Sequence, residues 1–209
     1  MKLYFSPGAC SLSPHIALAE SGLPYAYEIE LVNLKSRQTA SGEDFDQRNP
    51  KGYVPALLLD SGDLLTEGPA IVQYIADQAP DTGLAPPYSN LARYQLQGWL
   101  TFIGTELHKS CSPFFNPTAT EEWKKTAMAN IRRRLDYVNT VLRGQPYLMG
   151  EHFTVADAYL YTVLSWGRYM KLELSEWPEI ATYQARVHAR PAVQRALEAE
   201  RAAKTSSRS

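Results

Sequence analysis

The sequence predicts a small α/β domain followed by an all-α domain. Strand and helix patterns alternate over residues 1–78, a Pro- and Gly-rich stretch occupies residues 79–87, and helical patterns dominate after it. A stretch of that composition is typical of a domain linker. We therefore expect one domain at residues 1–79, a linker at residues 80–88 and a helical domain at residues 89–209.

The first domain opens with a short strand over residues 2–5 and a loop over residues 6–9. A helix follows, because Pro14 suits a first helical turn and Gly22 is a common stop after the last one. Residues 25–31 carry the apolar and aromatic pattern of a second strand.

The same domain ends with a hairpin and a helix. Residues 55–59 and 63–66 flank the sequence Asp-Ser-Gly, which is typical of a turn between two strands. The helix over residues 68–79 has Pro69 near its start. The expected order is therefore β-α-β, an irregular link, then β-β-α.

In the second domain we expect helices over residues 89–110 and 121–142, one from residue 155, and two more over 179–188 and 191–201. After these, residues 202–209 look like a frayed polar tail.

The helix that begins near residue 155 has a marked start. Thr154 stands at the N-cap and Asp157 three residues later, which is a capping-box arrangement with Asp in place of Glu. We expect a structural role for Asp157.

Composition excludes several functions. The 209 residues carry a formal net charge of −1, and their one basic cluster, residues 132–134, suits a solvated helix face, so we expect no nucleic-acid partner. No apolar run approaches the roughly 18 residues of a membrane span, and no signal-peptide pattern occurs, so we expect a cytoplasmic protein with no membrane partner. Two cysteines and four scattered histidines predict neither a disulfide framework nor a metal site.

Cys10 is the first candidate for chemistry. It stands where a loop meets a helix N-terminus, and the partial positive charge there is expected to lower the thiol pKa. The segment Cys10-Ser11-Leu12-Ser13 resembles a CxxC redox motif whose second cysteine is a serine, so only one-thiol chemistry is available. The alternative is an inert cysteine.

Two further segments suit the binding of a peptide. Pro55 directly before a strand is a candidate for a cis bond, which would leave the backbone of Val54 free to pair with an extended ligand. Glu67 and Gly68 stand at a helix start, where an acid can pair with an amino group and backbone N–H groups with a carboxylate. Because Pro69 has no N–H, Gly68 has to supply more of that contact. A plain loop and a polar cap are the alternatives.

Taken together, these segments and others along the chain resemble the cytosolic glutathione transferases. The motifs that carry the resemblance are FSPGACSLSPH, NPKGYVPALLLDSGDLLTEGPAIVQYIAD, WLTFIGTELHK and HFTVADAYLYTVLSW. Within this family, the chain resembles the bacterial beta class, because it has a cysteine at position 10 of such an N-terminus. The resemblance implies an α/β thioredoxin-like N-terminal domain, an all-α C-terminal domain, glutathione as co-substrate and a homodimer.

The resemblance also implies residue roles. Cys10, with Ser11 close by, would face the glutathione sulfur, Val54 would pair with the cysteinyl backbone, and Glu67 and Gly68 would hold the γ-glutamyl end. The remaining expected contacts come from Lys35, which would reach the glycine carboxylate, and from Thr101, Thr105, Glu106 and His108, some of them in the partner subunit.

His108 would donate to the thiolate or orient it; its alternative is a polar residue on an exposed face. Two residues depart from the family pattern: Thr101 stands where asparagine is frequent, and Tyr53 where glutamine is frequent. The aromatic candidates for an electrophile pocket are Phe114, Phe115, Trp166 and Tyr169.

Three hypotheses follow. In the first, the enzyme conjugates the glutathione thiol to a hydrophobic electrophile, and Cys10 need not be the nucleophile. In the second, Cys10 forms a mixed disulfide with glutathione and supports thiol transfer, peroxide reduction or reductive dehalogenation. The third is a non-catalytic protein that binds glutathione or hydrophobic ligands.

Overall fold

The computed structural model describes residues 1–23 and 28–206. Residue contacts divide the chain into two compact units: residues 86–188 form one, and residues 1–85 form the other together with the segment that starts at residue 189. The boundary falls inside the expected linker, whereas the last helix groups with the first unit. The three-part division given above stays a prediction.

The sheet of the first unit has five strands in the order β3-β2-β1-β4-β5. β1 pairs parallel with β2 and antiparallel with β4, while β4 and β5 form the predicted hairpin. The strands are β1 (Lys2–Phe5), β2 (Glu28–Asn33), β3 (Gln38–Thr39), β4 (Ala56–Leu58) and β5 (Leu64–Thr66).

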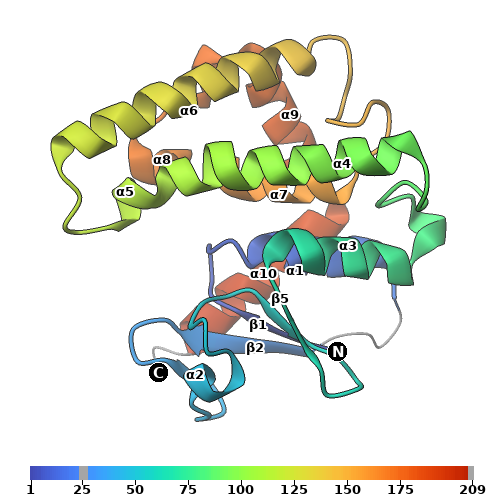
Figure 1. Cartoon of the computed structure of the whole chain (residues 1–209), viewed down its shortest axis with the longest axis vertical. Coiled ribbons are helices and arrows are strands. Elements are labelled where there is room, and N and C mark those ends of the chain that lie inside the picture. The colour runs from blue at the N-terminus through green and yellow to red at the C-terminus, as the bar shows by residue number, and fades with distance from the viewer. Residues whose placement is uncertain (24–27, 207–209) are drawn as a thin grey trace. The chain divides into compact units, whose positions relative to one another are not determined.

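The side chains of β1 alternate between the two faces of the sheet, and both faces are covered by helices. Phe5 lies 5.9 Å, centroid to centroid, from His15 of α1 (Leu12–Ser21), and Tyr4 lies 5.4 Å from Phe45 of α2 (Phe45–Arg48). Successive strand residues point to opposite faces, so α1 and α2 cover different sides. In Figure 1, α1 and α3 (Gly68–Gln78) lie side by side over one face.

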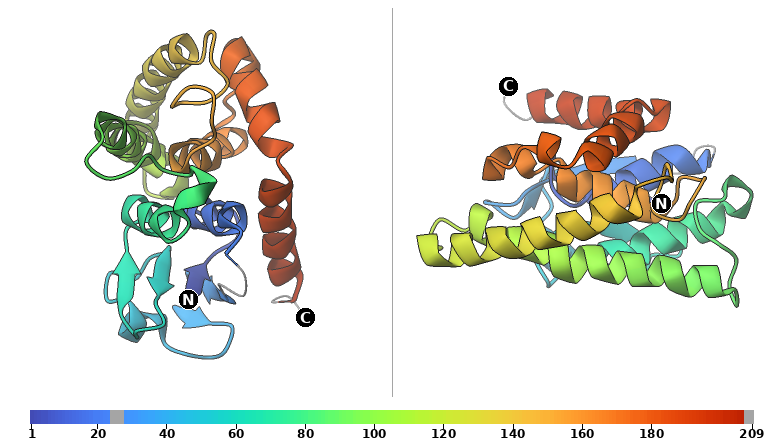
Figure 2. Two further views of the ribbon diagram at one scale, coloured as in Figure 1. Left: turned by 90° about the vertical axis from the view of Figure 1, so that its right-hand side faces the viewer. Right: turned by 90° about the horizontal axis from the view of Figure 1, so that it is seen from above.

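Two more elements belong to this unit. The short η1 (Pro80–Thr82) follows α3, and α10 (Pro191–Ser206) lies beside α1, as the left view of Figure 2 shows. Gly22 ends α1 as predicted, with a left-handed φ of 61° that a residue with a side chain rarely adopts.

The other unit is helical and is built around α7, whose ten residues are all buried. Its elements, in chain order, are α4 (Leu91–Phe102), the π-helix η2 (Ile103–His108), η3 (Lys109–Cys111), α5 (Ser112–Phe115), α6 (Glu121–Val141), α7 (Val155–Leu164), α8 (Gly167–Met170), η4 (Leu174–Glu176) and α9 (Pro178–His188).

The predicted capping box at the start of α7 is confirmed. One oxygen of Asp157 accepts the N–H of Thr154 at 2.8 Å and its hydroxyl at 3.1 Å, and the other accepts the N–H of Leu148 at 2.9 Å and the hydroxyl of Tyr183 at 3.1 Å. The fully buried carboxyl therefore joins the loop before α7, the start of α7 and α9.

Several boundaries differ from the predictions. Residues 25–27 of the second expected strand lie outside the described residues, and β2 runs on to Asn33. The single helix expected over residues 89–110 changes to π and 3₁₀ geometry after residue 102. Residues 202–206, expected to be a frayed tail, continue α10, whose Ala and Lys residues favour helix.

Across the part of the chain that the structure describes, no helix is both long enough and apolar enough to cross a membrane.

Candidate functional site

The loop that carries Cys10 is tied down by its own residues. The Ser11 hydroxyl accepts the N–H of Ser6 at 3.1 Å and donates to the carbonyl of Ser6 at 3.2 Å. The N–H of Ala9 also donates to the Ser6 carbonyl, at 3.0 Å. The Ser11 side chain is fully buried and its hydroxyl is hydrogen-bonded to Ser6. Only the backbone N–H of Ser11 can therefore face a ligand at Cys10.

The thiol of Cys10 donates a hydrogen bond to the carbonyl oxygen of Val54 at 3.2 Å. Burial raises the pKa of Cys10 to about 11, and the nearby negative charge of Glu67 adds to the increase. The N–H groups of Cys10 and Ser11 lower the pKa but only offset part of the burial effect. The expectation of a lowered thiol pKa is therefore wrong for the chain without a ligand, in which the thiol is protonated at neutral pH.

The peptide bond between Val54 and Pro55 is cis, as predicted. The side chain of Val54 is buried, and its N–H has no hydrogen-bond partner among the residues that the structure describes. The amide of buried Asn49 donates to the carbonyl of Tyr53 at 2.8 Å, which fixes the approach to this bond. Asn49 was not predicted, although it opens the quoted NPKGYVP segment.

Glu67 precedes α3, and one of its oxygens accepts two hydrogen bonds. The donors are the ammonium group of Lys51 at 2.6 Å and the hydroxyl of Tyr53 at 2.8 Å. Lys51 first, and then Tyr53, lower the pKa of Glu67, so its carboxylate is ionised at neutral pH. Gly68 begins α3 directly after it. The sequence reasoning missed Lys51, whose signal was a cation at the start of the same NPKGYVP motif.

The first unit thus brings Cys10, Val54, Glu67 and Gly68 together, since the thiol contacts Val54 and feels the charge of Glu67. Lys35 is in the same unit but lies on an exposed turn after β2, where its N–H donates to the side-chain oxygen of Asn33 at 3.0 Å.

Residues predicted in α4 and η2 are held by partners within the helical unit. Thr101 and Thr105 are exposed, and the hydroxyl of Thr105 donates to the carbonyl of Thr101 at 3.0 Å. Glu106 forms an ion pair with Arg134 of α6.

His108 is more buried than a residue of an exposed face. Its Nδ1 lies 2.7 Å from the hydroxyl oxygen of Tyr159 in α7, and its ring packs 4.8 Å from that of Trp166. Burial, assisted by the charge of Lys109, lowers the pKa of His108 to about 4. His108 is therefore neutral at physiological pH.

The aromatic candidates extend this cluster. The Phe115 ring lies 5.7 Å from Trp166 and 6.0 Å from Tyr169, and both Phe115 and Tyr169 are more than half exposed. Phe114 makes no ring contact with another aromatic side chain within the described ranges.

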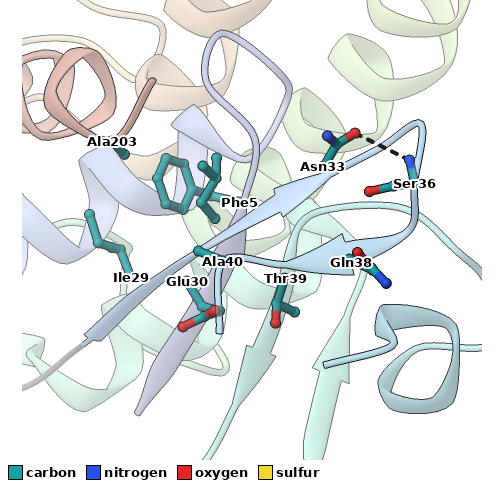
Figure 3. Close-up of a pocket in the computed structure, with 10 residues that line it drawn as sticks. Phe5, Ile29, Glu30, Asn33, Ser36, Gln38, Thr39, Ala40 and Ala203 are labelled. Carbon is teal, nitrogen blue, oxygen red and sulfur yellow. Dashed lines mark hydrogen bonds between the residues drawn. The ribbon is translucent and has the colours of Figure 1, made fainter. Parts of the chain in front are cut away.

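A cavity of about 470 Å³ lies elsewhere in the first unit, at the β2–β3 edge. Figure 3 shows Phe5, Glu30 and Thr39 lining it, with Ala203 of α10 close to Phe5. None of the candidate ligand contacts lines this cavity.

Three features of the first unit define a glutathione transferase fold when a helical unit follows. They are a cysteine at the start of α1, a cis-proline before a sheet strand and an acid before α3. The sequence matches the glutathione S-transferase N-terminal domain over residues 8–78 and the C-terminal domain over residues 102–191. "Glutathione S-transferase GstA" of Escherichia coli O157:H7 is 48% identical, over 96% of this chain and 98% of that protein.

Solved structures agree. BphK, a bacterial glutathione transferase seen in a ternary complex, is 55% identical with a TM-score of 0.93, over 96% of this chain and 99% of that one. A sphingomonad enzyme complexed with glutathione is 46% identical (TM-score 0.92), and a beta-class enzyme of Sphingomonas chungbukensis is 44% identical (TM-score 0.91). Each of these two covers 96% of this chain and 98% of its own. The chain belongs to the glutathione S-transferase family, is similar to its bacterial beta class, and is an enzyme of that family.

Proposed function

We propose that the enzyme joins the thiol of glutathione to a hydrophobic electrophile, and that Cys10 acts as a neutral hydrogen-bond donor to the glutathione sulfur. The observation that carries this proposal is the contact of the Cys10 thiol with the Val54 carbonyl. It places a protonated thiol beside a backbone that has a free N–H and a carbonyl, which is the pattern an extended peptide pairs with.

Glutathione fits the polar groups around this contact. Its cysteinyl N–H would take over the Val54 carbonyl, and its cysteinyl carbonyl would accept the Val54 N–H. The γ-glutamyl ammonium group would pair with Glu67, and its carboxylate would meet the N–H groups at the start of α3, beginning with Gly68. Lys35 would reach the glycine carboxylate. The complex of the sphingomonad enzyme with glutathione supports this choice of ligand.

The reaction follows from the release of Cys10. Once glutathione occupies the Val54 carbonyl, the Cys10 thiol is free to donate to the glutathione sulfur, together with the N–H of Ser11. These donors stabilise the thiolate, so the glutathione proton is lost to solvent. The thiolate then attacks the electrophilic carbon, a C–S bond forms, and the leaving group departs with its bonding electrons.

Residues of the helical unit complete the proposal. Thr101, Thr105 and Glu106 would contact glutathione, in its own subunit or in a partner. His108 would donate a hydrogen bond to the thiolate or orient it. It would not supply a positive charge, because its low pKa keeps the ring neutral. The exposed rings of Phe115 and Tyr169 would receive the hydrophobic electrophile.

Thiol transfer, peroxide reduction and dehalogenation through a Cys10 mixed disulfide form the second candidate. They need a reactive Cys10 thiolate, and the raised pKa opposes one in the free chain. The thiol is only partly buried and stands at a helix start, so this candidate calls for a direct test. A non-catalytic ligand carrier would bind glutathione without turnover.

Replacing Cys10 separates the candidates. We expect Cys10→Ala to keep conjugation of a chlorodinitrobenzene substrate within about 10²-fold of the wild type, because only one donor to the sulfur is lost. Thiol transfer to a mixed-disulfide substrate would vanish in this variant. Intact mass after treatment with glutathione disulfide, which exchanges with a thiolate and releases one glutathione, reports on covalent attachment, with Cys111→Ala as the control. Calorimetry that detects no binding of glutathione would refute the proposal.

We further propose a homodimer and a cytoplasmic location. The helical unit exposes a set of aromatic side chains that suits a second copy of the chain. Both cysteines, Cys10 and Cys111, are free thiols, which suits a reducing compartment.

A further inference from the structure

The C-terminal helix α10 is fastened to both ends of α1. At its start, the guanidinium of Arg190 donates to both carboxylate oxygens of Glu20, at 2.6 and 2.9 Å, and Arg195 donates to the carbonyl of Ala19 at 3.2 Å. These contacts hold the C-terminal end of α1. Further along α10, Glu200 reaches the other end of α1.

Glu200 is a charged residue in an almost fully buried position, with 4% of its surface exposed. One carboxylate oxygen accepts the N–H of Gly8 at 2.8 Å. The other lies 3.5 Å from Nδ1 of His15, which is 1% exposed. Burying a carboxylate is costly unless specific partners compensate for the lost water. The hydrogen-bond partner here, Gly8, stands in the loop before Cys10, and the neighbouring His15 stands in the helix after it.

Gly8 lies in the middle of that loop and donates its N–H to Glu200. It has a φ of 76°, a conformation that glycine adopts without strain. Ser11 ties the beginning of the loop through Ser6, and Glu200 ties its middle through Gly8. The loop before Cys10 is therefore hydrogen-bonded to a side chain that is 192 residues from Gly8 in the sequence.

We propose that Glu200 is a positioning residue for the glutathione site. Its carboxylate holds the Gly8 N–H, and this hydrogen bond keeps the Cys10 thiol in contact with Val54. Glu200 acts through the loop and does not touch the substrate. The effect of Glu200 on catalysis rests on the proposed function of Cys10. The effect of Glu200 on the position of the Cys10 thiol does not.

The test compares Glu200→Ala and Glu200→Gln in the full-length protein. The exposed Glu198, on the same helix, provides the control Glu198→Ala. Three quantities are measured: the rate of Cys10 alkylation by iodoacetamide, followed on the Cys10 peptide by mass spectrometry; hydrogen exchange of the segment over residues 6–11; and kcat and KM for glutathione.

We expect Glu200→Ala to speed alkylation and hydrogen exchange at least about fivefold, because an untied loop exposes the thiol and the Gly8 amide. KM for glutathione should rise about tenfold while kcat changes less than about threefold, since the loss lies in holding glutathione rather than in the chemical step. Glu200→Gln keeps an oxygen acceptor for Gly8, so all three quantities should stay within about twofold of the wild type.

Two results would overturn the proposal. One is a Glu200→Ala protein whose alkylation rate or KM equals that of Glu198→Ala, even if its thermal stability falls. The other is a Glu200→Gln protein that behaves like Glu200→Ala. Alkylation and exchange need no glutathione, so they test the positioning role even if the wild type does not bind glutathione. If Glu200→Ala does not fold, hydrogen exchange of Gly8 in Glu200→Gln decides, with protection retained in support and lost in contradiction.

Discussion

At the scale of single residues, the state of the Cys10 thiol decides which chemistry the site can perform. Burial raises the pKa of Cys10 to about 11, well above the ordinary thiol value of roughly 8.5. Only the thiolate reacts with iodoacetamide. We therefore expect the alkylation rate of Cys10 to be low at pH 7 and to keep rising through pH 10, when it is followed on the Cys10 peptide by mass spectrometry.

Cys111 supplies the internal comparison for that measurement. Its pKa is raised to about 12, and its thiol, which is 2% exposed, donates to the Leu107 carbonyl at 3.3 Å. It should remain unmodified in the native protein. An inflection of the Cys10 rate at or below pH 8 would contradict a protonated Cys10 and would favour the mixed-disulfide reactions.

The second residue-scale prediction concerns Glu67 and the hydroxyl of Tyr53. Glu67→Gln removes the charge that would pair with the γ-glutamyl ammonium group, so KM for glutathione should rise about tenfold. This effect is small for a hydrogen bond to a charged group, because the Glu67 side chain is half exposed. Tyr53→Phe removes one neutral donor from a carboxylate that Lys51 still holds, so KM should change about twofold. Steady-state kinetics with varied glutathione measure both.

Equal effects of these two substitutions would refute the proposed assignment, because they would make the Tyr53 hydroxyl as important as the charge. The resemblance to the family implies that Tyr53 replaces a frequent glutamine. Its hydroxyl lies 2.8 Å from Glu67, which gives the departure a physical function: it is a donor to the same carboxylate.

At the scale of elements, α7 depends on the buried carboxyl of Asp157. Burial raises the pKa of Asp157 to about 6, although its four hydrogen-bond donors oppose the increase. Asp157→Asn replaces one acceptor oxygen by an NH₂ group that faces donors. We expect it to lower the free energy of unfolding by about 1–3 kcal/mol at pH 7, as measured by urea denaturation. Val155→Ala at the same helix start gives a comparison for lost packing alone.

The pH dependence has a definite sign. An aspartate with a pKa near 3.9 in the unfolded chain and about 6 in the folded one binds more protons when folded between these values. Its contribution to stability is therefore complete below pH 4 and decreases as the pH rises to 6, by up to about 3 kcal/mol. The stability difference between the wild type and Asp157→Asn should shrink over that range. A difference that grows instead would place the folded pKa of Asp157 below its unfolded value.

Elements were predictable from the sequence where they depend on neighbouring residues. The hairpin between β4 and β5, the cis bond at Pro55 and the capping box of Thr154 and Asp157 each involve side chains a few positions apart. The π-helix η2 was not predictable, because His108 is bonded to Tyr159, 51 residues away, and Gly104 lies against the same hydroxyl, where an added Cβ would be 3.5 Å from it.

The site was predictable to a similar extent. The proximity of Cys10, Val54 and Glu67 was predictable because each stands beside a helix start or a proline, and their roles toward a ligand stay predictions. The raised pKa of Cys10 was not, since the helix-terminus argument ignores desolvation, and burial depends on how the whole unit packs. The Gly8–Glu200 hydrogen bond joins residues 192 positions apart, and only the folded chain reveals it.

At the scale of the whole molecule, the helical unit exposes several large aromatic side chains. The rings of Trp99 and Phe102 in α4 pack with that of Tyr137 in α6, at centroid distances of 5.5–5.9 Å. A groove of about 260 Å³ lies beside them, and Tyr137 is 52% exposed. We define the aromatic patch as Trp99, Phe102 and Tyr137, and α4 also carries the exposed Leu91 and Tyr94. Contiguous apolar surface of this kind marks interaction sites.

We expect the wild type to be a dimer at micromolar concentration in sedimentation velocity, and Tyr137→Glu to shift it toward the monomer by at least about tenfold in Kd, because a carboxylate would be buried in the aromatic patch. The control is Lys125→Glu, at an exposed position of α6 about a third of a turn around the helix from Tyr137. Circular dichroism of both variants checks that the helices remain. A wild type that sediments as a monomer, or a Tyr137→Glu protein that dimerises as tightly as Lys125→Glu, would show that this patch does not hold two copies together.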